Sequence, residues 1–159
     1  MREIMKLEDI LQPSLVLDSL AAESKAALLA EMAEHVCLRL PEIQTPSSII
    51  QDYLQQRENL GSTGIGQGIA IPHTKVPGLS HLVACFGRSR QGIDYNAIDG
   101  QPVQLVFMLL IPENSAGMHL KALARISRVL KNDEFRETLL GLADAPAIYD
   151  AFLAREREF

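Results

Sequence analysis

The 159-residue chain carries a net charge of −5, and 47% of its residues are hydrophobic and 22% charged. These values are ordinary for a globular protein, and the length predicts a single domain over residues 1–159. The acidic balance disfavours binding to nucleic acid or to an anionic membrane surface. The longest apolar run, Leu105 to Ile111, is far shorter than the about 20 residues of a membrane span, so we expect none.

The start of the chain and its two cysteines indicate the compartment. The segment MREIMKLEDI mixes charges of both signs and has no apolar core, which predicts that no secretory signal is present. Cys37 and Cys85 lie far apart in apolar segments, which excludes a disulfide framework or a zinc ribbon. We therefore expect buried, reduced thiols in a cytoplasmic protein.

The first third of the chain predicts two helices. Apolar residues recur at helical spacing from about residue 21 to residue 40, where Pro41 ends the pattern. A second helix is expected from Pro46, with Thr45 as N-cap and Gly61 as C-terminal cap. Its predicted apolar face comprises Ile49, Ile50, Tyr53, Leu54 and Leu60.

The middle of the chain predicts strands. The stretch GSTGIGQGIAIPHTKVPG, residues 61–78, holds five of the ten glycines and is typical of a loop with a short strand at residues 69–71. Residues 82–87 and 103–111 are apolar runs that suit buried strands. The connection between them, residues 92–100, is expected to contain a short strand at residues 93–95.

The last third predicts helices again. We expect one helix over residues 117–131 with Ser115 as its cap, a short one capped by Asp133, and a final one opened by Asp144 and Pro146. Strands in the middle with helices on both sides predict an α/β fold. Its expected form is a three-layer α/β/α domain with a mixed central sheet of about five strands flanked by helices.

The glycine-rich loop is the first candidate for chemistry. A dinucleotide fingerprint needs a strand before the loop and a helix after it, whereas here a helix precedes and a proline-containing segment follows. A P-loop is also excluded, because no Gly-Lys-Ser/Thr follows. The glycines could still let backbone N–H groups approach an anion closely, and the alternative is a plain tight loop.

Three side chains of unusual type accompany the loop. His73 follows Pro72 on a stiff backbone, and its imidazole could act as a nucleophile; the alternative is a surface histidine without a role. Arg57 falls on the apolar face of its helix, where it either has a function or extends past the helix end. His119 lies on an apolar face in the first helical turn, as a core histidine or beside an anion site.

Taken together, these side chains suit a phosphoryl group. They would supply one nucleophile, one fixed cation and several N–H donors. Cys85 is a poor competing nucleophile in its apolar run, and His35 and His81 have no neighbours at metal-ligand spacing.

At these residues the chain resembles the type 2 enzyme IIA domains of the bacterial phosphoenolpyruvate-dependent phosphotransferase system, the fructose/mannitol family. The resemblance covers about residues 7–152. It is carried by Arg57 followed by GSTGIGQGIAIPHTKV, by the strand QPVQLVFMLLIP, and by HLKALARISRVL. The opening LEDILQPSLVLDSLAAESKAALLAEMAEHV is more similar to the nitrogen-related subgroup than to sugar-specific members, which are often fused to other domains; we expect this chain to stand alone.

The resemblance implies a role for each candidate. His73 matches the phosphoacceptor, Arg57 the arginine that contacts the phosphoryl group, and His119 the second histidine that orients the site. Ser62, Thr63 and Gly64 are further candidate contacts to the phosphoryl group. Thr74 departs from the family pattern, which often has glycine or another small residue there, and this makes the loop slightly less free.

The implied function is a phosphocarrier that accepts phosphate from HPr or its nitrogen-branch equivalent without a metal or organic cofactor. Its regulatory targets would include proteins such as a transporter or a sensor kinase, chosen by phosphorylation state. One alternative is a sugar-specific component that passes phosphate to a IIB protein. Another is a binding module without phosphoryl turnover.

Overall fold

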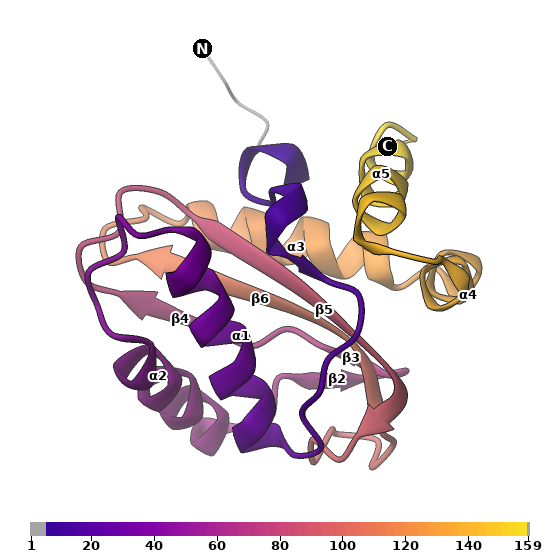
Figure 1. Cartoon of the computed structure of the whole chain (residues 1–159), viewed down its shortest axis with the longest axis horizontal. Helices are drawn as coiled ribbons and strands as arrows, with labels where there is room; N and C mark the ends of the chain where they lie inside the picture. The colour runs from indigo at the N-terminus through magenta and orange to yellow at the C-terminus, as the bar shows by residue number, and fades with distance from the viewer. Residues whose placement is uncertain (1–5, 159) are drawn as a thin grey trace.

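The computed structural model describes residues 6–158 (Figure 1). Two 3₁₀ turns, Leu7–Asp9 and Pro13–Leu15, precede the first strand. The strands are β1 (Val16–Leu17), β2 (Gly64–Gly66), β3 (Ile69–Ala70), β4 (His73–Val76), β5 (Val83–Ile93) and β6 (Val103–Pro112). The helices are α1 (Lys25–Arg39), α2 (Ser47–Leu60), α3 (Met118–Leu130), α4 (Asp133–Gly141) and α5 (Ala145–Glu156).

The strands form one mixed sheet in the order β1-β5-β6-β3-β2, with β4 also paired to β6. β5 and β6 are antiparallel, with Phe86 opposite Phe107. β3 and β4 follow one another along the other edge of β6, both parallel to it, with Ile69 opposite Leu105 and His73 opposite Leu109. The predicted mixed sheet is confirmed. Two strands in the glycine-rich stretch were not predicted from the sequence: β4 pairs with β6, and β2 pairs antiparallel with β3.

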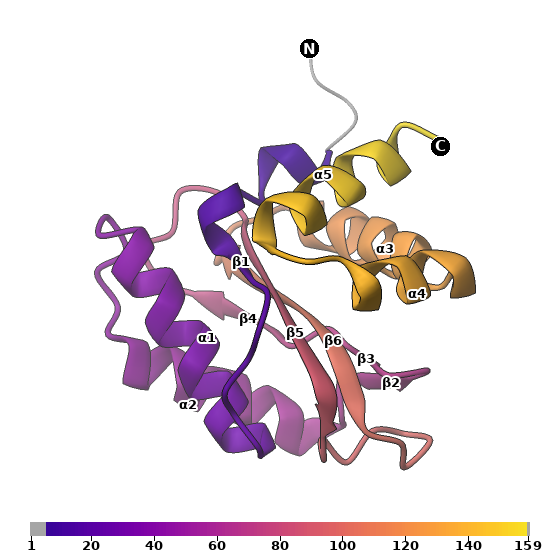
Figure 2. The same cartoon turned by 45° about the vertical axis from the view of Figure 1, so that its right-hand side comes forward.

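Helices cover both faces of the sheet, as predicted. Figure 2 shows α1 and α2 on one side and α3, α4 and α5 on the other. On the second side, the ring centroid of Phe152 in α5 lies 4.9 Å from that of Phe86 and 5.5 Å from that of Phe107. Nearly every side chain of β6 is buried, which explains why its sequence is one continuous apolar run rather than an alternating one.

Helix ends depart from the prediction at three caps. Asn132, not Asp133, caps α4 by accepting a hydrogen bond from a backbone N–H. Thr45 does not cap α2; its hydroxyl donates to the carbonyl of Pro77, and Pro46 occupies the cap position. Ser115 does not cap α3 either, since Gly117 is the residue before its first turn. Asp144 caps α5 as expected.

Two further expectations concern a membrane span and the ends of the chain. Within residues 6–158, none of the helices combines the length and the apolar character needed to cross a bilayer. The segment in which we expected no secretory signal begins in residues 1–5, which lie outside the described residues, as does residue 159 at the end of the predicted domain.

Candidate functional site

One open pocket of about 380 Å³ brings together Arg57, His73 and His119. They come from three separate elements: the last turn of α2, the first residue of β4 and the first turn of α3. The remaining lining residues are Thr74, Lys75, Ile111, Leu120 and Leu123. The pairing of β4 with β6 places His73 opposite Leu109, in the second half of the strand that precedes α3.

The imidazole of His73 is held by a backbone carbonyl two residues earlier in the chain. Its Nδ1 lies 2.8 Å from the carbonyl oxygen of Ile71. A carbonyl oxygen can only accept a hydrogen bond, so Nδ1 carries the proton and Nε2 keeps the lone pair. Of the two ring nitrogens, Nε2 is therefore the available nucleophile.

The surroundings keep this ring neutral. Burial is the largest influence and lowers the pKa of His73 below its ordinary value of 6.5, while the hydrogen bond to Ile71 raises it. The positive charge of Arg57 and the proximity of His119 lower the pKa further, and the charge of Glu58 opposes them. A lowered pKa leaves the lone pair of Nε2 unprotonated at neutral pH.

Arg57 reaches the end of its own helix. Its Nη1 donates to the carbonyl oxygen of Gly61 at 2.9 Å. Within residues 6–158, this is the only hydrogen bond that the guanidinium makes. The side chain extends past the end of its helix, which was one of the two interpretations from the sequence. It also lines the pocket, and its other N–H groups are available to a ligand there.

His119 is half-buried at the pocket rather than in the core. Its Nδ1 lies 2.7 Å from the hydroxyl oxygen of Ser115. Ser115, expected to cap α3, instead orients this ring. The serine hydroxyl can donate or accept, so this contact holds the ring in place in either tautomer.

The other three candidates, Ser62, Thr63 and Gly64, lie at the start of the glycine-rich stretch and not among the residues that line this pocket. The hydroxyl of Ser62 accepts from the N–H of Gly64 at 3.0 Å. Thr63 is buried, and its hydroxyl donates to the carboxylate of Glu58. Their contact with a phosphoryl group stays a prediction.

Glu58 is the residue beside the site that the sequence reasoning missed. It is 5% exposed and shares the buried face of α2 with Ile50 and Leu54. Leu60, which we expected on that face, is 85% exposed. The spacing of four residues from Ile50 to Leu54 to Glu58 was the available signal, since it places a carboxylate on the apolar stripe.

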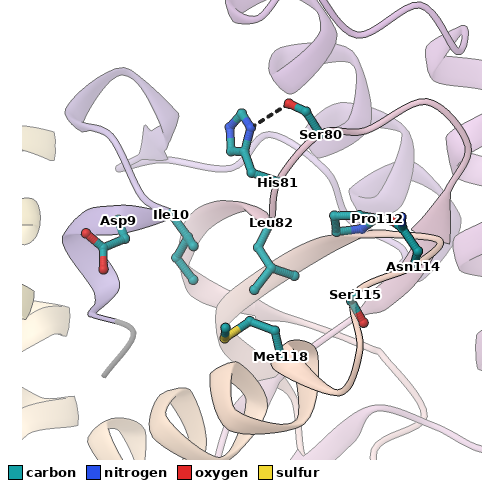
Figure 3. Close-up of a pocket in the computed structure, with 9 residues that line it drawn as sticks. All are labelled: Asp9, Ile10, Ser80, His81, Leu82, Pro112, Asn114, Ser115 and Met118. Atoms are coloured by element: carbon teal, nitrogen blue, oxygen red, sulfur yellow. Dashed lines mark hydrogen bonds between the residues drawn. The ribbon is translucent and has the colours of Figure 1, made fainter. Parts of the chain in front are cut away.

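A second pocket of about 340 Å³ is lined in part by Ser115, the hydrogen-bond partner of His119 (Figure 3). Its apolar lining comes from Ile10, Leu82, Pro112 and Met118, and its polar lining from Asp9, Ser80, His81, Asn114 and Ser115. Nδ1 of His81 lies 2.9 Å from the hydroxyl oxygen of Ser80. Ser115 thus lines this pocket while it holds His119, which lines the first.

Other chemistry has less support. Within the described part of the chain, no group of three or more His, Cys, Asp or Glu side chains is arranged to hold a metal ion. Burial raises the pKa of the Cys85 thiol, so Cys85 stays protonated and inert. The geometry at the first pocket, with a neutral imidazole, a guanidinium and a second imidazole, suits the binding and transfer of an anionic group.

Comparison with known proteins identifies a family for this chain. The family model described as phosphoenolpyruvate-dependent sugar phosphotransferase system, EIIA 2, matches residues 9–155. A nitrogen regulatory protein of Bradyrhizobium diazoefficiens is 40% identical over 145 residues, which cover 91% of this chain and 93% of that protein. The crystal structure of nitrogen regulatory protein IIA-Ntr from Neisseria meningitidis matches with a TM-score of 0.84 and 33% identity over 91% of this chain and 97% of that one.

A sugar-specific relative matches a shorter part of the chain. The fructose-specific EIIABC component of Bacillus subtilis is 44% identical over 100 residues, which cover 63% of this chain and 16% of that protein.

Proposed function

Because the chain belongs to the EIIA type 2 family of the phosphoenolpyruvate-dependent sugar phosphotransferase system, we propose that it is a cytoplasmic phosphocarrier that accepts a phosphoryl group on His73. The observation that carries the proposal is the hydrogen bond from Nδ1 of His73 to the carbonyl oxygen of Ile71. It leaves Nε2 as the free nucleophile of a ring that lines a pocket with Arg57 and His119.

The proposed step is a direct transfer between two imidazoles. The lone pair of His73 Nε2 attacks the phosphorus of a phosphohistidine on HPr or its nitrogen-branch equivalent, and the donor's P–N bond breaks as the new one forms. The donor ring reacts as the cation that carries a proton on its second nitrogen. It takes the electron pair of the P–N bond and leaves as neutral imidazole, so no proton has to move. The ring of His73 becomes positively charged, and the Ile71 carbonyl stabilises its Nδ1–H.

The protein's contribution to this step is position and charge. The transferring group carries its negative charge on three equatorial oxygens, and there is little covalent chemistry for the protein to do. Arg57 supplies the fixed cation with N–H groups free for these oxygens, and His119, held by Ser115, supplies a second donor. Ser62, Thr63 and Gly64 remain candidates for additional contacts.

We further propose that the phosphorylation state selects regulatory partners, such as a transporter or a sensor kinase. Phosphorylation adds about −1.5 to −2 charges to the pocket. A partner with acidic groups near His73 would then bind one state and be repelled by the other. The similarity over nine-tenths of the chain to proteins named nitrogen regulatory supports this regulatory form.

The alternative is sugar transport, in which His73 passes its phosphate to a IIB protein. The similarity to the fructose-specific EIIABC component favours it. The test is whether labelled phosphate reaches a IIB protein and then a sugar.

The proposal is tested with radiolabelled phosphoenolpyruvate, Enzyme I and either HPr or the nitrogen-branch carrier. We compare the parent protein with His73→Ala and with His81→Ala, which removes an exposed histidine that does not line the pocket of His73. Acid-labile, base-stable label on the parent and on His81→Ala, but not on His73→Ala, supports the proposal. No label on the parent, with both donors active on a control acceptor, leaves a binding module without turnover.

A further inference from the structure

A buried carboxylate, that of Glu58, is the next side chain after Arg57 of the proposed phosphoryl site. Glu58 follows Arg57 in the last turn of α2, and its side chain is 1% exposed. Burying a charged carboxylate is unfavourable unless it is paired and hydrogen-bonded. The partners of Glu58 therefore indicate what this charge holds together.

Three residues from separate parts of the fold converge on Glu58. The backbone N–H of Thr63 and the ammonium group of Lys25 each donate to Oε1 at 3.1 Å. The Tyr95 hydroxyl donates to Oε2 at 3.1 Å, and the Thr63 hydroxyl donates to the same oxygen. Burial and the charge of Glu58 raise the pKa of Tyr95, which keeps its hydroxyl protonated as a donor.

Thr63 connects Glu58 to His73 through a series of hydrogen bonds. Glu58 holds both the N–H and the hydroxyl of Thr63. The carbonyl oxygen of Thr63 accepts from the N–H of Ile71 at 3.0 Å. The carbonyl oxygen of Ile71 in turn accepts from Nδ1 of His73 at 2.8 Å. The carboxylate, the glycine-rich stretch and the imidazole thus form one continuous series of hydrogen bonds.

We propose that Glu58 is a positioning residue for His73: through Thr63 and Ile71 it fixes the ring with its proton on Nδ1 and its lone pair on Nε2. The inference deepens the proposed function, and its catalytic meaning rests on that function. Glu58 touches neither the phosphoryl group nor the imidazole. Its effect passes through two backbone carbonyls.

Glu58 also acts on His73 through its charge. Its negative charge favours the protonated form of His73, opposite in sign to the effects of Arg57 and His119. Arg57 and Glu58 are neighbours in sequence, so one helix turn supplies a cation to the pocket and a balancing anion behind it. Removal of the anion alone is expected to lower the pKa of His73.

Two substitutions separate position from charge. Glu58→Gln keeps an oxygen for the Thr63 N–H and an amide for the two hydroxyls, but it removes the charge. Glu58→Ala removes the anchor itself. Asp52→Asn is the matched control, because it removes one negative charge from an exposed position of the same helix. Denaturant unfolding and backbone amide spectra identify the variants that keep the fold.

The main readout is the ring ¹⁵N spectrum of His73 over a pH titration, together with the rate of phosphate acceptance. We expect the parent and Asp52→Asn to carry the proton on Nδ1 with the same titration midpoint. Glu58→Gln is expected to keep this tautomer and titrate at lower pH. Glu58→Ala is expected to lose the single tautomer and to accept phosphate about 100-fold more slowly, as expected for a misplaced reacting group.

The result that overturns the inference is a folded Glu58→Ala protein whose His73 tautomer and titration match the parent. An equal shift in Asp52→Asn and Glu58→Gln also overturns it, since it would reflect net charge alone. If Glu58→Ala does not fold, Glu58→Gln decides through its titration. A parent that takes no phosphate contradicts the proposed function but not the positioning of the ring, which the spectra report separately.

Discussion

The backbone carbonyl of Ile71 accepts a hydrogen bond from Nδ1 of His73, two residues later in the chain, at 2.8 Å. The contact is local, yet it depends on the pairing of β4 with β6 that places His73 opposite Leu109. It determines which of two chemically similar nitrogens faces the pocket.

Phosphorylation is expected on Nε2 of His73. Nδ1 keeps its proton and its carbonyl partner, so it has no lone pair to offer. The linkage is measured by ³¹P–¹⁵N coupling in protein phosphorylated with ¹⁵N-labelled histidine. A phosphoryl group on Nδ1 would contradict the orientation of the ring described above.

Arg57→Gln is expected to slow phosphate acceptance by about 10²–10³-fold, the usual cost of removing one preorganised donor to a developing charge. Because Arg57 lowers the pKa of His73, the same substitution should raise that pKa. Stopped-flow or quench measurements with the phosphorylated donor give the rate, and a histidine titration gives the pKa.

Two variants serve as references for Arg57→Gln. Arg57→Lys keeps the charge but not the planar fork, so an intermediate rate is expected. Arg39→Gln removes an exposed arginine from the last turn of α1 and should leave both quantities unchanged. An unchanged rate in Arg57→Gln would remove Arg57 from the mechanism.

The pH dependence follows from the lowered pKa of His73. Folded protein binds fewer protons at this ring than unfolded protein does between the lowered pKa and the ordinary value of 6.5. The free energy of unfolding should therefore rise with pH through this window and stop changing above it, as far as His73 contributes. Urea unfolding at a series of pH values measures the slope.

His73→Asn is the reference for the pH experiment, because the amide does not titrate. The slope below pH 6.5 should be smaller in this variant by the contribution of one histidine. Equal slopes in the two proteins would show that the ring titrates alike in the folded and unfolded states.

The aromatic cluster beneath α5 is expected to dominate the stability of that layer. Phe152 is fully buried, and its ring contacts Phe86, Phe107 and Phe135 at centroid separations of 4.9, 5.5 and 5.4 Å. Phe152→Ala should lower the free energy of unfolding by about 3–5 kcal/mol. Leu38→Ala, at a residue 77% exposed, should change it by less than about 0.5 kcal/mol. Urea unfolding of both variants checks the contrast.

Much of the fold was predictable because it rests on local patterns. The continuous apolar run of β6 marks a strand buried on both faces, and Pro41, Gly61 and Asp144 mark helix boundaries near their observed places. The glycine-rich stretch was predicted mostly as a loop, because β3 and β4 form by pairing with β6 and β2 then pairs with β3. The pairing with β6 joins residues 36 positions apart, such as Ile69 and Leu105, and no local pattern encodes it.

The sequence by itself determined the types of side chain available for chemistry. Histidine after proline in a glycine-rich stretch, and arginine and histidine at the ends of helices, stand out because their polarity conflicts with their surroundings in the chain. The sequence also determined the layers of the fold, because hydrophobic burial follows from periodicity.

Only the tertiary structure decided how these side chains are held. It places Ser115 on His119 rather than at a helix cap, and it places Lys25, Thr63 and Tyr95 around the carboxylate of Glu58. A hydrogen bond depends on distance and angle between particular atoms, and those are set by packing between segments far apart in sequence. The choice of Nε2 over Nδ1 in His73 is of the same kind.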